Sequence, residues 1–297
     1  MSLRDFALLA LVCVVWAANA VVSKIILSGF GAPPLFYGAA RFAVVVLATA
    51  PWLIPAPRPL WRMLVVGLLM GGGAFALSYI GLETTSPSAS AIVGQLGVPI
   101  ATVLSIVFLG EQVHWRRGLG IALTLAGALV VMWDPKGFAP SVGLIFVAGS
   151  ALTGALGAVL MKQIEGVKPL QFQAWVGFSS LWPLALLSGL TEHGQGAVVA
   201  HAFVPFAAAI LFSGLVVSVL AHTAYYGLIQ RYEVNLLQPL TLMSPLATIV
   251  LGVIITHDAF GARMAVGSTV ALAGVLMIAL RRNHVAPLLL LIRNRAQ

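Results

Sequence analysis

About ten apolar runs, each long enough to cross a membrane, follow one another through this chain. A helix rises 1.5 Å per residue, so roughly 20 apolar residues cross the ~30 Å hydrocarbon core of a bilayer. The sequence is 60% hydrophobic and only 8% charged, which leaves too few charges to cover a water-soluble surface. It therefore predicts an all-α polytopic membrane protein with ten transmembrane helices. The expected spans are 6–27, 34–53, 64–82, 88–109, 115–133, 142–161, 170–190, 206–229, 234–255 and 263–280.

The net charge of +8 is explained by membrane topology better than by nucleic acid, because the basic residues are scattered over short loops. If Arg4 is cytoplasmic, twelve Lys and Arg residues in the loops and at the ends of the expected spans lie on the cytoplasmic side, and only Lys136 and Arg263 lie on the other. This bias predicts that both termini are cytoplasmic in a multi-pass protein of a bacterial-type inner membrane. We expect the lipid bilayer as a partner and no nucleic acid.

No polar segment is long enough to form a separate soluble domain, so we do not expect transport driven by an ATPase domain of the chain's own. Cys13 is the only cysteine, which excludes an intrachain disulfide and a cysteine-rich metal site. The sequence indicates neither a cofactor nor a metal, and a monomer is compatible with it.

A short segment occurs twice. Leu96-Gly-Val-Pro99-Ile-Ala-Thr102 resembles Leu242-Met-Ser-Pro245-Leu-Ala-Thr248, and the two prolines lie 146 residues apart. In lipid, a proline-broken helix is tolerated where neighbours, side chains or water satisfy the freed carbonyl group. We therefore expect Pro99 and Pro245 in mid-helix, lining a protein-enclosed cavity and acting as hinges.

Other matches extend the repeat. Tyr79 and Tyr225 align at the same offset, and the end of the first apolar run, 16–24, resembles 154–162, since both finish with a lysine. If each half holds five helices, the odd number makes the second half enter the membrane from the opposite side. The chain is thus expected to form two inverted five-helix repeats around a central cavity, 1–138 and 139–282, followed by a basic cytoplasmic tail, 283–297. Such symmetry predicts alternating access.

Several motifs resemble the EamA family of the drug/metabolite transporter superfamily. Trp16-Ala-Ala-Asn19 followed by Lys24 resembles the first helix of the family, and Arg41-Phe42 resembles the second. The stretch from Thr85-Ser-Pro-Ser-Ala-Ser90 to Leu109-Gly-Glu111 resembles its third-to-fourth helix signature, whereas Thr256-His257-Asp258 departs from the Gly-Glu usual after the ninth helix. The resemblance implies ten helices in two five-helix repeats and export of solutes from the cytoplasm. Within the family, the chain is most similar to the aromatic amino-acid exporter branch.

All eight carboxylates fall at the ends of expected helices or in loops, so none is expected at the midplane. Export of lipophilic cations through a buried carboxylate is therefore disfavoured. Lys24 and Arg41 lie within expected spans, where a charge costs roughly 2.5 to 3.5 kcal/mol. They either attract an anionic group of the solute or are structural, through snorkelling or pairing with Asp134.

The candidate substrate-binding residues combine stacking faces with neutral hydrogen-bonding groups, which suits an amphiphilic or zwitterionic small molecule. His222 precedes Tyr225 and Tyr226 by three and four residues, so one helix face can carry an imidazole and a phenol. The candidates are Trp16, Asn19, Tyr79, Gln95, Trp175, His222, Tyr225, Tyr226, Gln238, Thr241 and Ser244. His222 leaves proton coupling open, although the missing midplane carboxylate favours facilitated transport.

The sequence therefore predicts a membrane transporter that exports amino acids, aromatic and other neutral ones, by alternating access. A carrier for phosphorylated or nucleotide-linked solutes is the alternative, and it requires Lys24 and Arg41 to face the cavity together. A membrane-embedded enzyme or a channel subunit is the alternative outside transport. The sequence contains no His/Asp/Glu cluster with metal-ligand spacing and no Ser/His/Asp set, so no catalytic residue is expected.

Overall fold

The computed structural model describes residues 1–109, 115–134, 139–161, 164, 166–232, 237 and 240–279. In this part of the chain, seven helical segments are long and apolar enough to cross a membrane, and three shorter apolar helices accompany them. All ten fall in the regions expected from the sequence. The long segments are Leu3–Gly29, Pro34–Leu53, Leu60–Thr84, Pro87–Phe108, Val142–Met161, Pro169–Thr191 and Phe203–Leu228, and the shorter ones are Gly118–Met132, Met243–Ile255 and Ala262–Ile278.

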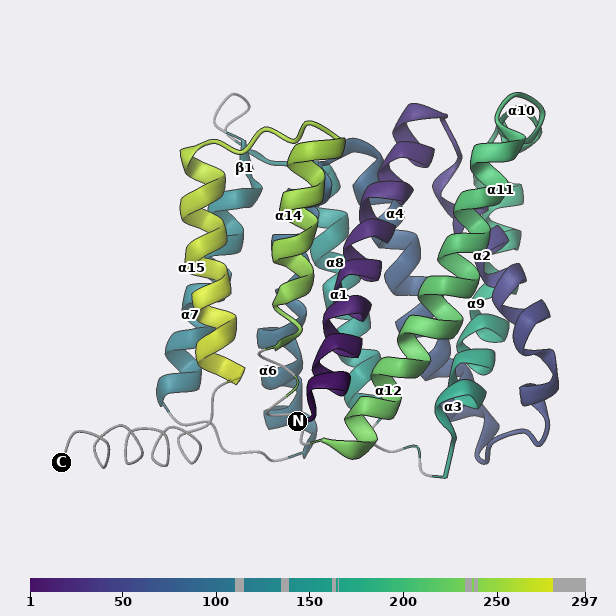
Figure 1. Cartoon of the computed structure of the whole chain (residues 1–297), viewed down its shortest axis with the longest axis horizontal. Coiled ribbons are helices and arrows are strands. Elements are labelled where there is room, and N and C mark those ends of the chain that lie inside the picture. Colours follow the sequence, from purple (N-terminus) through teal and green to yellow (C-terminus); the bar gives the residue numbers. More distant parts are fainter. Residues whose placement is uncertain are drawn as a thin grey trace.

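The helices stand side by side and form one bundle (Figure 1). In the first half, the elements are α1 (Leu3–Lys24), η1 (Ile25–Gly29), α2 (Pro34–Thr49), η2 (Ala50–Leu53), α3 (Leu60–Gly67), η3 (Leu68–Gly73), α4 (Ala74–Thr84), α5 (Pro87–Gly94), α6 (Gly97–Leu109) and α7 (Trp115–Met132). The second half contains α8 (Val142–Met161), α9 (Pro169–Thr191), α10 (Gln195–His201), α11 (Phe203–Leu211), η4 (Phe212–Ala221), α12 (His222–Arg231), α14 (Met243–Ile255) and α15 (Ala262–Ala279). Between the halves, β1 (Trp133–Asp134) pairs antiparallel with β2 (Ala139–Pro140).

The two halves start at opposite edges of the bundle. The amino terminus and the start of α1 lie at the lower edge in Figure 1, which we call the N-terminal edge. The β1–β2 pair and the start of α8 lie at the upper edge, which we call the far edge.

Two spans are broken at equivalent places in the two halves. The breaks fall at Gln95-Leu96, between α5 and α6, and at Thr241-Leu242, directly before α14. The prolines therefore lie in the first turns of α6 and α14, and the expectation that they are in mid-helix is wrong. Because proline has no N–H group, it cannot donate the helical hydrogen bond to the carbonyl four residues before it. The last turn before each proline tightens instead.

The carbonyl groups freed by the prolines have the same solution in both halves. Val98 N donates to Gln95 O at 3.1 Å, and Ser244 N donates to Thr241 O at 2.9 Å. Each donor is three residues from its acceptor, as in a 3₁₀ turn. The repeated sequence thus produces a repeated local structure, in which Gln95 and Thr241 occupy the two breaks.

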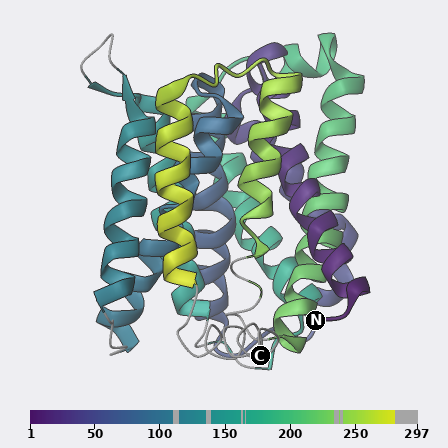
Figure 2. The same ribbon diagram turned by 60° about the vertical axis from the view of Figure 1, so that its left-hand side comes forward.

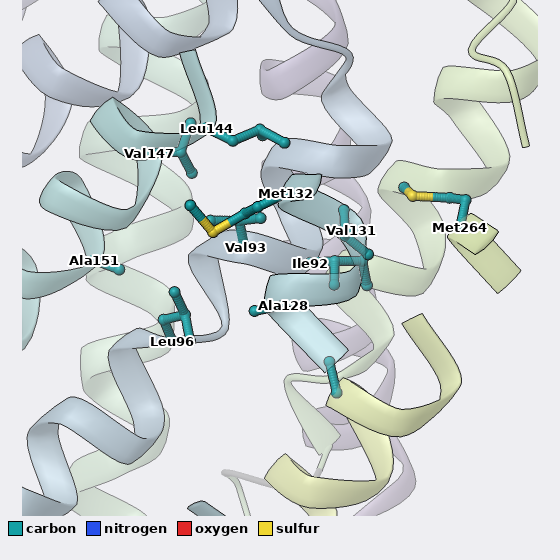
Figure 3. Close-up of a cluster of buried hydrophobic side chains, with 11 residues drawn as sticks. Ile92, Val93, Leu96, Ala128, Val131, Met132, Leu144, Val147, Ala151 and Met264 are labelled. Atoms are coloured by element: carbon teal, nitrogen blue, oxygen red, sulfur yellow. The ribbon is translucent and has the colours of Figure 1, made fainter. Parts of the chain in front are cut away.

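A buried apolar cluster holds the first break in place. Figure 3 shows Leu96 among side chains from α5, α7, α8 and α15. Leu96 is 7% exposed, and its neighbours Ile92 and Val93 are fully buried. Burying a side chain of this size stabilises a water-soluble protein by about 1.5–3 kcal/mol, whereas in lipid the gain comes from close packing. Gln95 can therefore be presented from a fixed backbone.

Helices α7 and α15 lie side by side in both views (Figures 1 and 2). Their contact depends on glycine, because a Cβ atom at Gly127 would collide with the backbone of Gly267 and Ala271. A Cβ atom at Gly274 would collide with the backbone of Thr124 and Gly120. Small residues allow such close approach between membrane helices, where lipid provides no hydrophobic driving force.

Three spans contain π-helical turns, namely η1, η3 and η4. In η4, the Ser218 hydroxyl donates to Ser213 O at 2.9 Å, and His222 Nδ1 lies 2.7 Å from Val217 O. Both contacts span five residues. π-Helical turns are frequent at functional sites, and η4 carries Ser213 and Ser218, whose hydroxyl groups bond to Asn19 and Arg41 as described below.

Candidate functional site

A cavity of about 200 Å³, which we call the polar cavity, lies between α1, α4, α5 and α14. It brings together six of the residues expected from the sequence: Trp16, Asn19, Tyr79, Gln95, Ser244 and Pro245. The remaining lining residues are Ala20, Ser23, Phe75, Ser78, Leu82, Pro87, Ser90, Ala91 and Thr248. Both halves of the chain contribute to this cavity, and its walls carry indole, phenol, amide and hydroxyl groups.

A chain of hydrogen bonds supports the α1 side of the polar cavity. The Ser213 hydroxyl donates to Asn19 Oδ1 at 2.6 Å. The hydroxyl groups of Tyr37 and Ser213 lie 2.8 Å apart, and those of Ser23 and Tyr37 lie 3.3 Å apart. Asn19, Ser23 and Tyr37 are buried, so these bonds satisfy polar groups that water does not reach. They also fix the orientation of the Asn19 side chain.

Arg41 lies directly behind the cavity wall and is fully buried, near the middle of its span. Its Nε and Nη2 donate to the Ser218 hydroxyl at 3.0 and 2.9 Å, and its Nη1 donates to the Tyr79 hydroxyl at 2.5 Å. The guanidinium carbon is 4.1 Å from the centre of the Phe75 ring, close enough for a cation–π interaction. In the described residues, no carboxylate lies within ion-pair distance of Arg41. The side chain is too deeply buried to snorkel.

Trp16 forms part of the wall of the polar cavity, and two further rings pack against it. The Trp16 ring lies 5.3 Å from the ring of His222 and 5.0 Å from that of Tyr225. The Trp16 indole Nε1 is buried and has no hydrogen-bond partner in the described residues. Trp16 thus combines a flat apolar face with an unused donor, as expected for a residue that contacts an aromatic or amphiphilic solute.

A second cavity, of about 470 Å³, lies beside the polar cavity and shares Phe75 and Ser78 with it. We call it the small-residue cavity, because Gly94, Gly97 and α8 residues such as Gly154 line it. His222 lines it too. Since the Val217 carbonyl accepts at 2.7 Å, Nδ1 of the neutral His222 ring carries the proton and Nε2 is left as an acceptor.

The two cavities are lined by equivalent helices from different halves of the chain. Trp16 of α1 lines the polar cavity, whereas Gly154 of α8, its counterpart in the sequence repeat, lines the small-residue cavity. The indole that lines the polar cavity in one half therefore corresponds to a glycine that lines the small-residue cavity in the other.

The structure does not bring the other candidates into the polar cavity. Trp175 is 7% exposed and packs in an apolar cluster, where its ring is 5.4 Å from that of Phe178. Tyr226 packs against Phe172, and Tyr225 contacts the polar cavity only through Trp16. Thr241 lies in the second break, and Pro99, in the first turn of α6, lines neither cavity. Gln238 lies outside the described residues.

Sequence reasoning missed several residues of the site. Ser23, Ser78, Ser90 and Thr248 line the polar cavity, and Phe75 separates it from Arg41. Serine and threonine are common in membrane helices because they donate to the carbonyl four residues earlier, as Thr248 does to Ser244 O at 2.9 Å. Their types therefore carried no functional signal. The spacing gave one, since Ser23 lies four residues after Asn19 on the same face of α1.

Lys24 does not join Arg41. Its Nζ donates to the carbonyl oxygens of Leu82 and Glu83 at 3.1 and 2.9 Å, at the end of α4. Neither Lys24 nor Arg41 lines either cavity. The arrangement required for a phosphate-binding pair is therefore absent from the described part of the chain.

Both edges of the bundle carry polar contacts between distant segments. At the N-terminal edge, Asp5 accepts from Tyr232 at 2.6 Å and lies 3.8 Å from Arg231. After α9, the Glu192 carboxylate accepts from the backbone amides of Leu35 and Phe36 at 2.7 and 2.9 Å, at the first turn of α2. A carboxylate is stabilised at a helix N-terminus by its free amides and by the helix dipole.

Comparison with known sequences decides the family. Residues 5–133 and 141–280 each match the EamA-like transporter family. The chain belongs to this family. The duplicated match covers most of the chain, and together with the apolar helices it makes the protein a multi-pass membrane protein of a transporter family.

Several relatives of the chain carry the names of amino-acid exporters. A protein of Escherichia coli (strain K12) named "Probable amino-acid metabolite efflux pump" is 25% identical over 286 residues, covering 93% of this chain and 94% of that protein. The "Probable terminal-alkyne amino-acid exporter" of Streptantibioticus cattleyicolor is 24% identical over 281 residues, covering 91% of each chain. A crystal structure with 18% identity aligns with a TM-score of 0.61 over 93% of this chain and 96% of that chain, which shows a common fold. The family match and the similarity to the named exporters support a membrane exporter.

Proposed function

We propose that this protein exports neutral amino acids, aromatic ones included, and related metabolites from the cytoplasm. The polar cavity carries the proposal, because its lining combines the Trp16 indole with neutral hydrogen-bonding groups such as Gln95 and Ser244. A zwitterionic solute with an apolar side chain needs both. The names of the relatives from Escherichia coli and Streptantibioticus cattleyicolor support the same class of solute.

Alternating access between two inverted five-helix repeats is the proposed mechanism. The duplicated family match, the equivalent breaks at Gln95-Leu96 and Thr241-Leu242, and the start of α8 at the edge opposite to that of α1 support it. In such transporters, symmetry-related packings exchange around a site near the bilayer midplane. The polar cavity lies at the contact of both halves, and the breaks supply positions where two helices can change direction.

The N-terminal edge is proposed to face the cytoplasm of a bacterial inner membrane. α3 begins near Arg62 and α12 ends at Arg231, both at this edge, whereas Arg263 lies at the start of α15, at the far edge. A cytoplasmic excess of Lys and Arg is the general rule for membrane proteins. Under this orientation, the solute enters from the N-terminal edge and leaves from the far edge.

Transport of phosphorylated solutes is less well supported. Lys24 is held by the carbonyl groups of Leu82 and Glu83, and Arg41 is turned toward two neutral hydroxyl groups behind the cavity wall. A phosphate ester would meet neither cation directly. We therefore retain an amino acid as the proposed solute.

Purified protein in liposomes tests the proposal. Counterflow of radiolabelled phenylalanine is measured against a panel of amino acids, phosphate esters and organic cations, with and without a pH gradient. We expect saturable counterflow that neutral and aromatic amino acids compete for and that needs no pH gradient. Transport of organic cations alone, or competition by phosphate esters alone, would overturn the proposal. Trp182→Phe provides a control, because Trp182 is 61% exposed on the outside of the bundle.

A further inference from the structure

We propose that the α1 side of the polar cavity is a carboxylate subsite, in which Asn19 and Tyr79 donate hydrogen bonds to the solute and Arg41 is the positioning residue behind them. The inference rests on the proposed function, because it identifies which group of an amino acid this wall receives. The inference predicts that the cavity binds a carboxylic acid more tightly than the corresponding amide, and this preference can be measured by binding without transport.

The direction of the hydrogen bonds makes Asn19 a donor toward the cavity. The Ser213 hydroxyl has one proton, and it donates this proton to Asn19 Oδ1. The Tyr37 hydroxyl must therefore donate to Ser213, and the Ser23 hydroxyl must donate to Tyr37. With its carbonyl oxygen occupied, Asn19 has its NH₂ group left for the cavity that it lines.

Tyr79 is turned into a donor in the same way. A guanidinium group has no acceptor, so the Tyr79 oxygen accepts from Arg41 Nη1. The single phenolic proton of Tyr79 is then directed away from Arg41, and Tyr79 lines the polar cavity. A cation that donates to a hydroxyl group polarises the hydroxyl, and the hydroxyl then donates its own proton more strongly.

The positive charge of Arg41 has no counter-charge in the described residues. Three of its N–H groups donate to the Ser218 and Tyr79 hydroxyl groups, which are neutral. Its guanidinium carbon lies 4.1 Å from the Phe75 ring, and this ring forms part of the cavity wall. An anion on the other side of this wall would therefore compensate a buried charge that is costly when unpaired.

Trp16 adds a third donor. It lines the polar cavity, and its Nε1 has no partner in the described residues. Three residues that line this cavity of about 200 Å³, Asn19, Tyr79 and Trp16, thus carry donors, and the Arg41 cation lies behind Tyr79 and Phe75. A carboxylate, which only accepts, matches this set, whereas an ammonium group, which only donates, does not.

Binding to solubilised protein tests the subsite directly. The probes are phenylacetate and phenylacetamide, which differ only in the carboxylate, and the readout is the shift in melting temperature with probe concentration. For the wild-type protein, we expect phenylacetate to bind roughly tenfold more tightly than phenylacetamide, since hydrogen bonds to a charged group are the stronger ones. Equal binding of the two probes, or no binding of phenylacetate, would contradict the inference.

Variants separate the subsite from a structural role. Tyr79→Phe removes the proposed donor and should abolish most of the preference for phenylacetate while phenylacetamide binds as before. Arg41→Gln should do the same, and Arg41→Lys should restore part of the preference because it keeps the charge. Trp182→Phe should behave as wild type. If Arg41 and Tyr79 only hold helices together, both probes will lose affinity equally and Arg41→Lys will restore neither.

Counterflow in liposomes distinguishes this inference from the proposed function. Transport of phenylalanine and phenylalaninamide at equal rates, with equal binding of the two phenylacetic probes, overturns the subsite but leaves amino-acid export standing. Binding of phenylacetate that depends on Tyr79, without any counterflow of amino acids, supports the subsite and overturns the proposed function.

Discussion

The Ser88 amide and hydroxyl both donate to the carboxylate of Asp258, which joins the first turn of α5 to the segment after α14. The hydrogen bond from the Ser88 amide measures 2.9 Å. The Thr256 hydroxyl donates to the other carboxylate oxygen of Asp258 at 2.7 Å. Ser88 directly follows Pro87, which lines the polar cavity. The contact therefore ties the two halves of the chain together at the far edge, beside the cavity that they share.

Replacing Asp258 with asparagine should favour opening at the far edge. The change removes the charge that strengthens three hydrogen bonds, each worth about 1.5–3 kcal/mol when one partner is charged. We expect a cysteine at Ala91, which lines the cavity, to react roughly tenfold faster with a membrane-impermeant thiol reagent added at the far side. The measurement uses a Cys13→Ser background, so that the introduced thiol is the only one.

A matched control lies at the opposite edge. Asp5→Asn removes the carboxylate that accepts from Tyr232 and faces Arg231 at the N-terminal edge. It should leave the reactivity of Ala91→Cys from the far side unchanged, because the contact of Asp5 lies at the opposite edge. Equal acceleration from the far side in both variants would mean that general loosening, and not the Ser88–Asp258 contact, controls access.

Gln95 and Trp175 should respond differently to substitution, although both are expected from the sequence to bind the solute. Gln95 lines the polar cavity at the first break, so Gln95→Ala should lower counterflow per folded molecule by roughly tenfold, through lost contacts with the solute. Trp175→Phe should lower the melting temperature, because a smaller ring replaces a large buried one. It should leave counterflow per molecule within about twofold of wild type.

Size-exclusion chromatography and quantification of folded protein in the liposomes separate the two effects. A loss of counterflow in Trp175→Phe without a loss of folded protein would return Trp175 to the site.

The spans could be predicted from the sequence because one strong constraint sets them. Hydrocarbon requires long apolar helices, so the runs from Pro34 and from Val142 appear in the structure with the expected bounds. The positions of Pro99 and Pro245 were less well predicted, since periodicity does not distinguish a proline within a helix from one in its first turn. The hydrogen bonds that the carbonyl groups of Gln95 and Thr241 accept show that each helix begins again before its proline, and these bonds are known only from the structure.

Part of the candidate site could be predicted because aromatic and amide groups are conspicuous in apolar helices, as Trp16 and Asn19 are. Arg41 was recognised, but its partners were not, because Ser218 belongs to a π-helical turn that shifts its side chain relative to regular helical spacing. Trp175 lies in an apolar cluster outside both cavities, which the sequence could not indicate. A tryptophan in a membrane helix has the same sequence context whether it faces a cavity or an apolar cluster.

Gly127 should be indispensable for packing, whereas Gly118 on the same helix should not. A Cβ atom at Gly127 would collide with the backbone of α15, but one at Gly118 would meet nothing within 4 Å. Gly127→Val should therefore strongly reduce the yield of folded protein and its melting temperature. Gly118→Ala should leave both unchanged or slightly raised, because alanine is the better helix former by about 1 kcal/mol. Equal losses in the two variants would show that the α7–α15 contact does not depend on close approach.

Pro245→Ala should slow transport without unfolding the protein. The new amide at position 245 can donate to the Thr241 carbonyl, which now accepts from Ser244, so the helix can extend through the break. If the break is the hinge, a continuous helix favours one of the two packings, and counterflow should fall roughly tenfold while the melting temperature is kept or raised. Pro99→Ala should act in the same direction, because Gln95 and Val98 form the equivalent turn.

Pro183 provides the control for the proline series. It lies inside α9, away from both cavities, so Pro183→Ala changes a membrane helix without touching the repeated breaks. The counterflow of Pro183→Ala should stay within about twofold of wild type, which is a smaller change than the roughly tenfold fall expected at a hinge. Equal slowing in Pro183→Ala and Pro245→Ala would assign the effect to helix stiffness in general. Unchanged counterflow in Pro99→Ala and Pro245→Ala would remove the hinge role from the repeated prolines and leave Pro245 as part of the cavity wall.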